Sequence, residues 1–345
     1  MAVHWSWAFG AESGATLSGD MGWTVPVAGG TVTGDSGVTY TYAGSPTRYS
    51  MSVSSFRHIR TPSAVFVPEG WLAMPIYCAT DWYKQATNGT IFEIVATSGK
   101  RIYAYQTSPS GTAPTGTIEV FVGSTSVGTF NLQVNTWYYL AVKYKIDDAN
   151  WSVDVFVDGA SVASGTSAEG SESTGTYGFG GFSYNGLAHV GQIIVYDWSG
   201  TGQEDAIFVT RCDSISDRAV TGTWTPSTGT DQYDVIDSPF STATYTENTS
   251  ASVGVYVECR SSPLSDASQL NLSGVTVRSV CTHDFSEGSG VSVKASICDS
   301  TACTSGAAVT PATGTTSYCF AVSDTQPSGG AWQTGSSVIV KHEVV

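Results

Sequence analysis

Hydrophobic and polar residues alternate most regularly in the segment 137–159, which reads WYYLAVKYKIDDANWSVDVFVDG. Apolar or aromatic side chains occupy every second position from Tyr138 to Ile146, the pattern of a strand with one buried face. The turn-forming residues DDAN interrupt this pattern before it resumes at Trp151. Asp158 and the glycine after it favour a second tight turn. The segment therefore predicts an antiparallel hairpin that leads into a further strand.

Shorter alternating segments recur along the rest of the chain, with glycine, serine and threonine between them. Many short strands joined by tight turns are typical of β-sandwiches, and no segment keeps a helical period for more than a couple of turns. A chain of 345 residues is too long for one ordinary sandwich. We therefore expect an all-β protein with two β-sandwich domains.

The hairpin carries a resemblance to a known fold. A tryptophan before an alternating strand, a turn, and a second strand ending in V-D-G resembles the central hairpin of laminin G-like domains, which are concanavalin A-like jelly rolls. The segment 193–197, IIVYD, resembles their last strand. The resemblance covers residues 1–200 and implies that the first domain is such a jelly roll. It also implies that Trp137 is buried against the core and that a short strand follows at Ser161 to Ala163.

The segment 198–203, WSGTGQ, is the expected domain boundary. Eight of the ten tryptophans lie at or before Trp198, so the composition changes there. We expect residues 204–345 to form a second, smaller, jelly-roll-like sandwich. Because few contacts normally cross a linker, limited proteolysis should cut between Trp198 and Asp205.

Two motifs follow the boundary, WTPSTG at 224–229 and YDVID at 233–237. Their order after a laminin G-like domain resembles structural proteins of tailed bacteriophages. The resemblance implies a virion component (head decoration, tail or fibre) with other capsid or tail proteins as partners. The last strand, Ser336 to Val345, should lie inside a sheet or form an edge that awaits a partner. We therefore expect a homo-oligomer, or docking on a virion lattice through the second domain.

Charge excludes some classes of partner. Charged residues make up only 12% of the chain, and the formal net charge of −15 is spread over both halves. An evenly acidic surface repels phosphate, which argues against nucleic-acid binding. No apolar run is long enough to span a membrane, and the first ten residues lack the features of a signal peptide. We expect assembly in a host cytoplasm and no membrane partner.

Six of the seven cysteines lie in the second half of the chain. They contain no C-x-x-C pair, which argues against zinc. Most lie within apolar strand segments, and in a cytosolic protein buried free thiols are favoured over disulfides. Cys298 and Cys303, separated by a short polar loop, are the best candidates for a disulfide.

Catalytic chemistry is weakly represented. Glycoside hydrolases of the concanavalin-like fold carry two carboxylates, usually on one strand as E-x-D-x-x-E, and no such run occurs here. The nearest candidates are Asp154 and Asp158, but Asp158 belongs to a turn. None of the five histidines has a second histidine at the spacing of a metal site. We therefore predict no enzymatic activity and no cofactor.

One metal site is conceivable. Asp147, Asp148 and Asn150 place oxygen ligands in a single turn, as calcium requires. The turn has no glycine and no remote acidic partner that the sequence identifies.

Glycan contacts are predicted in two loops that combine aromatic rings with polar groups. One loop contains Trp82 and Tyr83, and the other contains Tyr184 and Asn185. Packing of these rings within their own domain, or against another subunit, is the alternative. The sequence thus predicts a non-enzymatic structural protein of a tailed-phage virion, with a carbohydrate-binding module or adhesin as the second hypothesis. A glycoside hydrolase is third.

Overall fold

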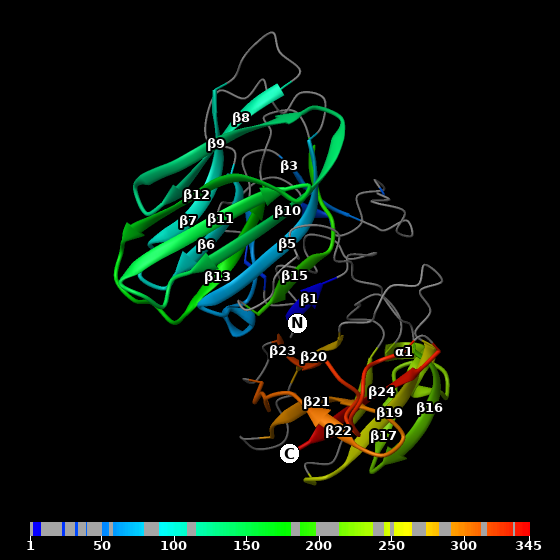
Figure 1. The fold of residues 1–345 in the computed structure, drawn as a ribbon. Coiled ribbons are helices and arrows are strands. Elements are labelled where there is room, and N and C mark those ends of the chain that lie inside the picture. Colours follow the sequence, from blue (N-terminus) through cyan, green and yellow to red (C-terminus); the bar gives the residue numbers. More distant parts are fainter. Residues whose placement is uncertain are drawn as a thin grey trace. The chain divides into compact units, whose positions relative to one another are not determined.

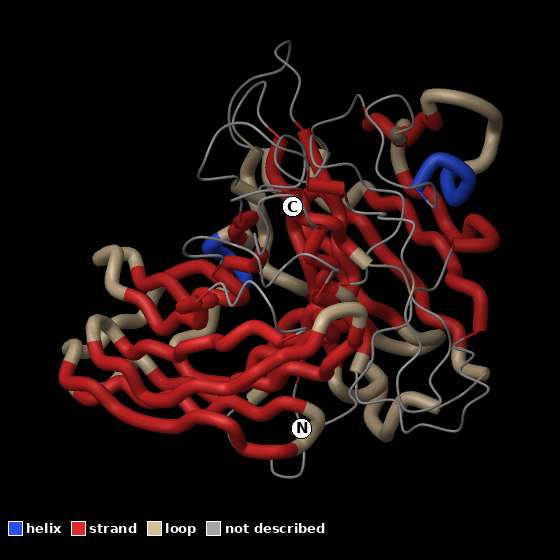
Figure 2. Tube along the Cα trace, turned by 90° about the horizontal axis from the view of Figure 1, so that it is seen from above, coloured by secondary structure: helices blue, strands red, loops and turns tan. Residues whose placement is uncertain are grey.

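The structure is a computed structural model of the whole chain. It describes residues 3–7, 23–24, 32–33, 39, 50–54, 58–78, 90–108, 115–180, 187–197, 214–236, 245–248, 252–263, 274–282, 291–311, 316–333 and 335–345. Strands are the dominant element of the described chain, as Figure 2 shows. None of its helices is long and apolar enough to cross a membrane. The all-β fold class is confirmed.

Contacts divide the chain into two compact units, Trp23–Val209 with most of the N-terminal residues, and Thr210–Val345 with a few of them. The predicted boundary at 198–203 lies outside the described residues.

The first unit contains two antiparallel sheets (Figure 1). The larger sheet has nine strands, and its main path runs β12-β11-β10-β5-β14-β3-β2, with β15 beside β5 and β1 beside β15. These strands are β12 (Ala160–Ala168), β11 (Asn150–Val157), β10 (Thr136–Lys145), β5 (Glu69–Cys78), β14 (Leu187–Val190), β3 (Met51–Ser54), β2 (Val32–Thr33), β15 (Ile193–Tyr196) and β1 (Val3–Trp7).

The smaller sheet has six strands in the order β4-β13-β6-β7-β8-β9. They are β4 (His58–Arg60), β13 (Gly175–Gly180), β6 (Thr90–Ala96), β7 (Arg101–Ser108), β8 (Thr115–Val122) and β9 (Thr125–Gln133). The edge strands β9 and β12 of the two sheets approach closely at glycines. A Cβ at Gly128 would lie 2.8 Å from the Cβ of Ala163, and one at Gly165 would lie 2.6 Å from Cγ1 of Val127. Any larger residue at either glycine would therefore push the two sheet edges apart.

The predicted hairpin is confirmed as β10 and β11, which pair from Leu140–Val157 to Lys145–Ser152. Asp158 and Gly159 both have positive φ (50° and 79°), which suits the tight turn into β12. That strand is longer than the predicted Ser161–Ala163. The resemblance-based expectation for Trp137 is wrong, because this residue is only half-buried.

Trp137 lies near one end of β10, on the phase in which burial is confined to Tyr139 and Ala141. Trp137 shares the phase of Lys143 and Lys145, and its ring lies beside Tyr77 with the ring centroids 5.2 Å apart. Among the described tryptophans, the fully buried ones are instead Trp5, Trp7, Trp23, Trp71 and Trp151. The expectation of one buried face also fails in part of β10, where residues 139–142 are buried on both phases.

The second unit is built on a five-stranded sheet in the order β16-β19-β24-β21-β22, with two further two-stranded sheets. Its strands are β16 (Ser214–Thr221), β19 (Tyr256–Pro263), β24 (Ser337–Val344), β21 (Val293–Cys298), β22 (Cys303–Ser305), the pair β17 (Trp224–Pro226) and β18 (Thr246–Asn248), and the pair β20 (Val275–Thr282) and β23 (Thr316–Ser323). A short helix, α1 (Gln232–Ile236), precedes β18. Apolar side chains of β20, β21, β23 and β24 form its core with Trp332.

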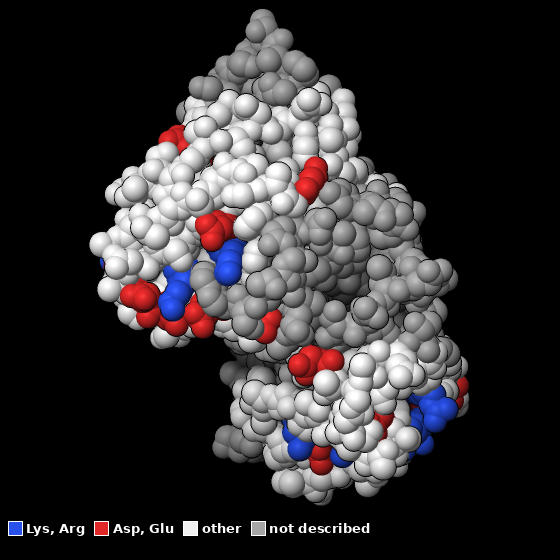
Figure 3. Space-filling view, viewed as in Figure 1, with Lys and Arg blue, Asp and Glu red and all other residues white. Residues whose placement is uncertain are grey.

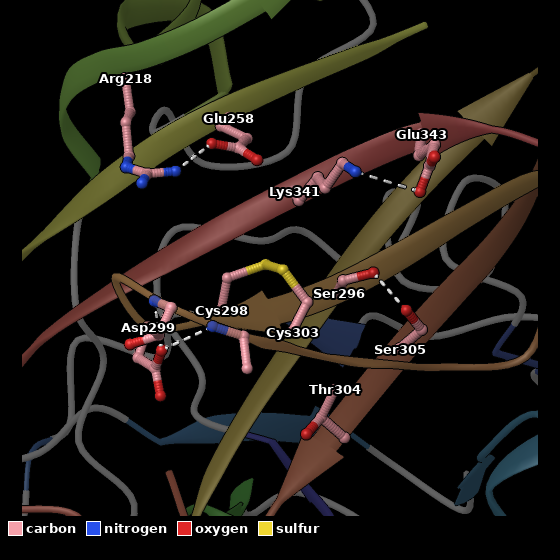
Figure 4. Close-up of a disulfide and its surroundings, with 12 residues drawn as sticks. Arg218, Glu258, Ser296, Cys298, Asp299, Cys303, Thr304, Ser305, Lys341 and Glu343 are labelled. Atoms are coloured by element: carbon pink, nitrogen blue, oxygen red, sulfur yellow. Dashed lines mark hydrogen bonds and ion pairs between the residues drawn. A yellow bond between two sulfur atoms is a disulfide. The ribbon is translucent and has the colours of Figure 1, made fainter. Parts of the chain in front are cut away.

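The predicted disulfide between Cys298 and Cys303 is confirmed, and it joins directly paired residues of β21 and β22 (Figure 4). Cys78, Cys259, Cys281 and Cys319 are free thiols. The terminal strand β24 lies between β19 and β21 and pairs with both. It is therefore an inner strand and no edge for a partner, so its deletion would disrupt the sheet itself.

Candidate functional site

Three aromatic rings lie together on one face of the six-stranded sheet. They belong to Tyr103 and Tyr105 on β7 and Phe121 on β8, and all three are partly exposed. The ring planes are within 13° of parallel, and the centroids are 5.1 Å apart for both pairs with Phe121 and 5.7 Å apart for the two tyrosines. We call these three residues the aromatic platform.

Strand alternation explains why the rings gather. Tyr103 pairs directly with Phe121 across β7 and β8, while Tyr105 pairs with Glu119. Residues two apart on a strand share a face, so Tyr105 falls next to both other rings. The intervening residues form the buried phase, namely Ile102, Ala104, Ile118, Val120 and Val122. The core thus fixes the backbone, and the platform occupies the opposite face.

A group of charged residues borders the platform at Tyr103. The Cζ atom of Arg101 lies 4.2 Å from the centroid of the Tyr103 ring, within the range of a cation–π interaction. The Glu93 side chain is fully buried, and its Oε1 accepts a hydrogen bond of 2.6 Å from Nε of Arg60. Its Oε2 lies 3.5 Å from Nη1 of Arg101. One buried carboxylate therefore holds two guanidinium groups.

Glycine makes room for this carboxylate. Gly178 on β13 pairs with Glu93, and a Cβ at this position would lie 2.4 Å from Cγ of Glu93. Any larger residue at Gly178 would displace the Glu93 side chain and with it the support of both arginines.

The other side of the platform carries oxygen and amide groups. Oγ of Ser126 donates a 2.5 Å hydrogen bond to Oε1 of Glu119, and Oγ1 of Thr117 donates a 2.9 Å bond to Oδ1 of Asn131. Burial and the nearby Glu119 carboxylate raise the pKa of Tyr105 above its ordinary value. The platform thus has the hydrogen-bond donors of Arg101 on one side, and both donors and acceptors, such as Asn131 and Glu119, on the other.

Charged side chains are few on the face drawn in Figure 3. Some acidic groups stand alone, others lie beside basic ones, and wide uncharged areas separate them. A group of partly exposed rings with polar groups at its borders is the composition of a recognition surface.

The predicted glycan contacts Trp82, Tyr83, Tyr184 and Asn185 all lie outside the described residues. They stay predictions, and the structure neither joins them to the platform nor separates them from it.

The predicted calcium ligands lie in the exposed turn between β10 and β11. Oδ1 of Asp147 is 3.8 Å from the Nζ of Lys145, and its backbone carbonyl accepts a hydrogen bond from the Ser171 hydroxyl. Asp148 and Asn150 are exposed. Within the described residues, no group of three or more acidic, histidine or cysteine side chains could hold a metal. An ammonium beside the carboxylate disfavours a cation, so calcium does not enter the proposal below.

Asp154 and Asp158, the nearest candidates for a glycosidase carboxylate pair, make contacts that stabilise the hairpin. Oδ1 of Asp158 accepts a 2.7 Å hydrogen bond from the backbone N–H of Tyr139, which ties the turn to β10. Asp154 pairs with Lys143 across β10 and β11.

No protein-family model matches the chain, and no curated protein matches it. Solved structures match at low similarity. Domain 4 of AbnA, a GH43 extracellular arabinanase from Geobacillus stearothermophilus in complex with arabinotriose, is 13% identical, with 55% of this chain and 93% of that domain covered and a TM-score of 0.33. The carbohydrate-binding module CBM66 from Bacillus subtilis is also 13% identical, with coverages of 52% and 97% and a TM-score of 0.32. The galectin LEC-6 from Caenorhabditis elegans is 14% identical, with coverages of 38% and 84% and a TM-score of 0.26.

These scores are too low to support an argument about function. The resemblance to phage structural proteins stays a prediction.

Proposed function

We propose that the first unit binds a glycan on the aromatic platform and that the chain is a non-enzymatic carbohydrate-binding module or adhesin. The observation that carries the proposal is the group of three nearly parallel, partly exposed rings of Tyr103, Tyr105 and Phe121 on one sheet face. The second hypothesis from the sequence thus becomes the first, although the binding residues are not those that the sequence predicted.

The chemistry of sugars matches this surface. A pyranose ring has an apolar C–H face and a rim of hydroxyl groups, so it packs on an aromatic ring while its hydroxyls seek donors and acceptors. Binding sites generally combine apolar and aromatic walls with a few well-placed polar groups. The carboxylate of Glu119, the amide of Asn131 and the guanidinium of Arg101 supply such groups around the platform.

The arrangement favours binding over hydrolysis. Glycosidases place an acid and a base or nucleophile on either side of one bond. Glu93 is buried beneath the platform's border and holds two arginines, while Glu119 lies beyond β7 and accepts a hydrogen bond from Ser126. These contacts assign Glu93 to positioning the arginines.

Glycan-array screening followed by titration calorimetry tests the proposal. Tyr105→Ala and Phe121→Ala should each weaken binding of the best array ligand about tenfold, because a central aromatic contact is typically worth more than 1 kcal/mol. The matched control is Tyr245→Ala, which removes an exposed tyrosine of the second unit. Unchanged affinity in both platform variants, or silence across a broad array, would refute glycan binding at this surface.

A further inference from the structure

Arg101 lies at the start of β7 in the same phase as Tyr103 and Tyr105. Its side chain is 45% exposed, although the guanidinium is held over the Tyr103 ring and beside the buried Glu93 carboxylate. An exposed arginine is usually mobile, since holding its long side chain in one geometry costs rotamer entropy. Here two contacts fix it at the border of the platform.

The contact to Glu93 leaves the donors of Arg101 available. Arg60 already donates a hydrogen bond of 2.6 Å to this carboxylate, whereas Arg101 approaches it only to 3.5 Å as an ion pair. Within the described part of the chain, the Arg101 guanidinium donates no side-chain hydrogen bond. Its planar group of five N–H donors is suited to bidentate recognition of a carboxylate, phosphate or sulfate.

The local charge also favours an anion. Among the described residues, two guanidinium groups share one carboxylate at this border, which leaves one positive charge, although the chain as a whole carries a formal charge of −15. The acidic residue Glu119 belongs to the other side of the platform, where it pairs with Tyr105. An anionic ligand would therefore be oriented, with its negative group at Arg101.

We propose that the ligand is an acidic glycan, whose carboxylate or sulfate group binds Arg101 while its sugar rings pack on Tyr103, Tyr105 and Phe121. This inference rests on the proposed function. Arg101 is the specificity-determining residue, and Glu93 and Arg60 are positioning residues. Gly178 leaves the space that the Glu93 side chain requires.

The test uses an array on which uronic-acid, sialic-acid and sulfated glycans are printed beside their carboxyl-reduced or desulfated forms. The best acidic glycan and its neutral form are then compared by titration calorimetry on the full chain. We expect the acidic form to bind at least tenfold more tightly in 50 mM salt, and the difference to shrink in 500 mM salt because exposed charges are screened. Comparing the glycans that carry a carboxylate with those that carry a sulfate shows which anion is preferred.

Arg101→Gln should remove this preference and leave residual binding of the neutral form, and Arg101→Lys should restore only part of it. The matched control is Lys341→Gln in the second unit, where an ammonium lies 4.1 Å from the Tyr256 ring and pairs with Glu343. This variant removes one positive charge that likewise lies over an aromatic ring and beside a carboxylate. It should change neither the affinity for the acidic glycan nor that for the neutral form.

Equal affinity for the acidic and neutral forms would overturn this inference while leaving the proposed function intact. So would an equal loss of both affinities in Arg101→Gln, since the arginine would then only support the platform. No binding of any glycan would overturn both. Unfolding midpoints of the variants within a few degrees of the parent confirm that the fold is retained.

Discussion

Two buried tyrosine hydroxyls connect the sheets of the first unit and offer a quantitative test of the fold. Tyr144 on β10 and Tyr177 on β13 are fully buried, and their hydroxyl oxygens are 2.5 Å apart. The Tyr144 hydroxyl donates to the carbonyl of Val67 at 2.8 Å, and the Val67 N–H donates to the Tyr177 oxygen at 3.1 Å. Both hydroxyl groups and the backbone N–H and carbonyl of Val67 all have hydrogen-bond partners if the Tyr177 hydroxyl donates to the Tyr144 oxygen.

The two single deletions should differ in cost. Tyr177→Phe leaves the Val67 N–H without its acceptor and the Tyr144 oxygen without its donor, so we expect about 2–3 kcal/mol of lost stability. In Tyr144→Phe the freed Tyr177 hydroxyl can turn to the Val67 carbonyl, which lies 3.4 Å away, so we expect about 1 kcal/mol. The double variant should cost about 0.5–1 kcal/mol less than the sum, because the bond between the hydroxyls is lost only once.

Denaturant unfolding followed by tryptophan fluorescence measures these differences. Eight of the ten tryptophans lie at or before Trp198, so the signal reports mainly on the first unit. Burial raises the pKa of both tyrosines, which adds a second readout. The unfolded chain ionises first above pH 10, so stability should fall there, and less steeply in either Phe variant. Additive costs, or a larger cost for Tyr144→Phe than for Tyr177→Phe, would contradict the proposed bonding.

Two further predictions concern single side chains of the first unit. Burial lowers the pKa of His189 to about 4, below its unfolded value of about 6.5, so the unfolded state takes up a proton first as the pH falls. Stability should therefore drop by up to about 2 kcal/mol between pH 6.5 and 5, and His189→Gln should reduce that slope in urea titrations; an unchanged slope would show that another group is responsible. Trp151 is fully buried, and its Nε1 donates a 2.5 Å hydrogen bond to a backbone carbonyl. Trp151→Ala should therefore lower the free energy of unfolding by about 3–5 kcal/mol. Trp137→Ala should cost far less, about 1 kcal/mol, and equal melting shifts for the two variants would contradict the burial described here.

Local pattern predicted strands well where alternation was strong. The hairpin of β10 and β11 and the terminal strand β24 lie within two residues of the predicted ranges. The edge strand β16, with the sequence SISDRAVT, has too few apolar residues to show a buried phase, so the pattern does not predict it. An edge strand needs fewer buried side chains, so its sequence carries a weaker signal.

Which face of a strand is covered depends on distant residues. Trp71, Tyr139 and Tyr196 are brought together on the outer phase of the larger sheet by the pairing of β5 with β10 and β15. Periodicity within β10 cannot reveal this, so the expectation of one buried face failed there. Trp137 was wrongly expected in the core because that expectation came from the resemblance to laminin G-like domains and not from the pattern within β10.

The platform did leave a signal in the sequence. In RIYAY at 101–105 and IEVFV at 118–122, the small and branched apolar residues occupy one phase, and the aromatic rings share the other phase with charges. Aromatic residues on the polar phase of two strands indicate a surface rather than a core. The glycan contacts were predicted in loops, whereas these rings lie on strands.

The buried carboxylate of Glu93 is hard to explain by stability alone. Taking a carboxylate out of water costs several kcal/mol, and an ion pair recovers this only with good geometry and further hydrogen bonds. Here one arginine has such geometry, while the second is 3.5 Å away and remains 45% exposed. An apolar residue at this position of β6 would avoid the cost, because Val95, two residues on and on the same face of the strand, is already buried. What Glu93 provides, and an apolar residue could not, is a fixed position for the Arg101 guanidinium at the border of the platform. Since a preorganised group loses less entropy when it binds, the expense in stability is accounted for if Arg101 receives a ligand.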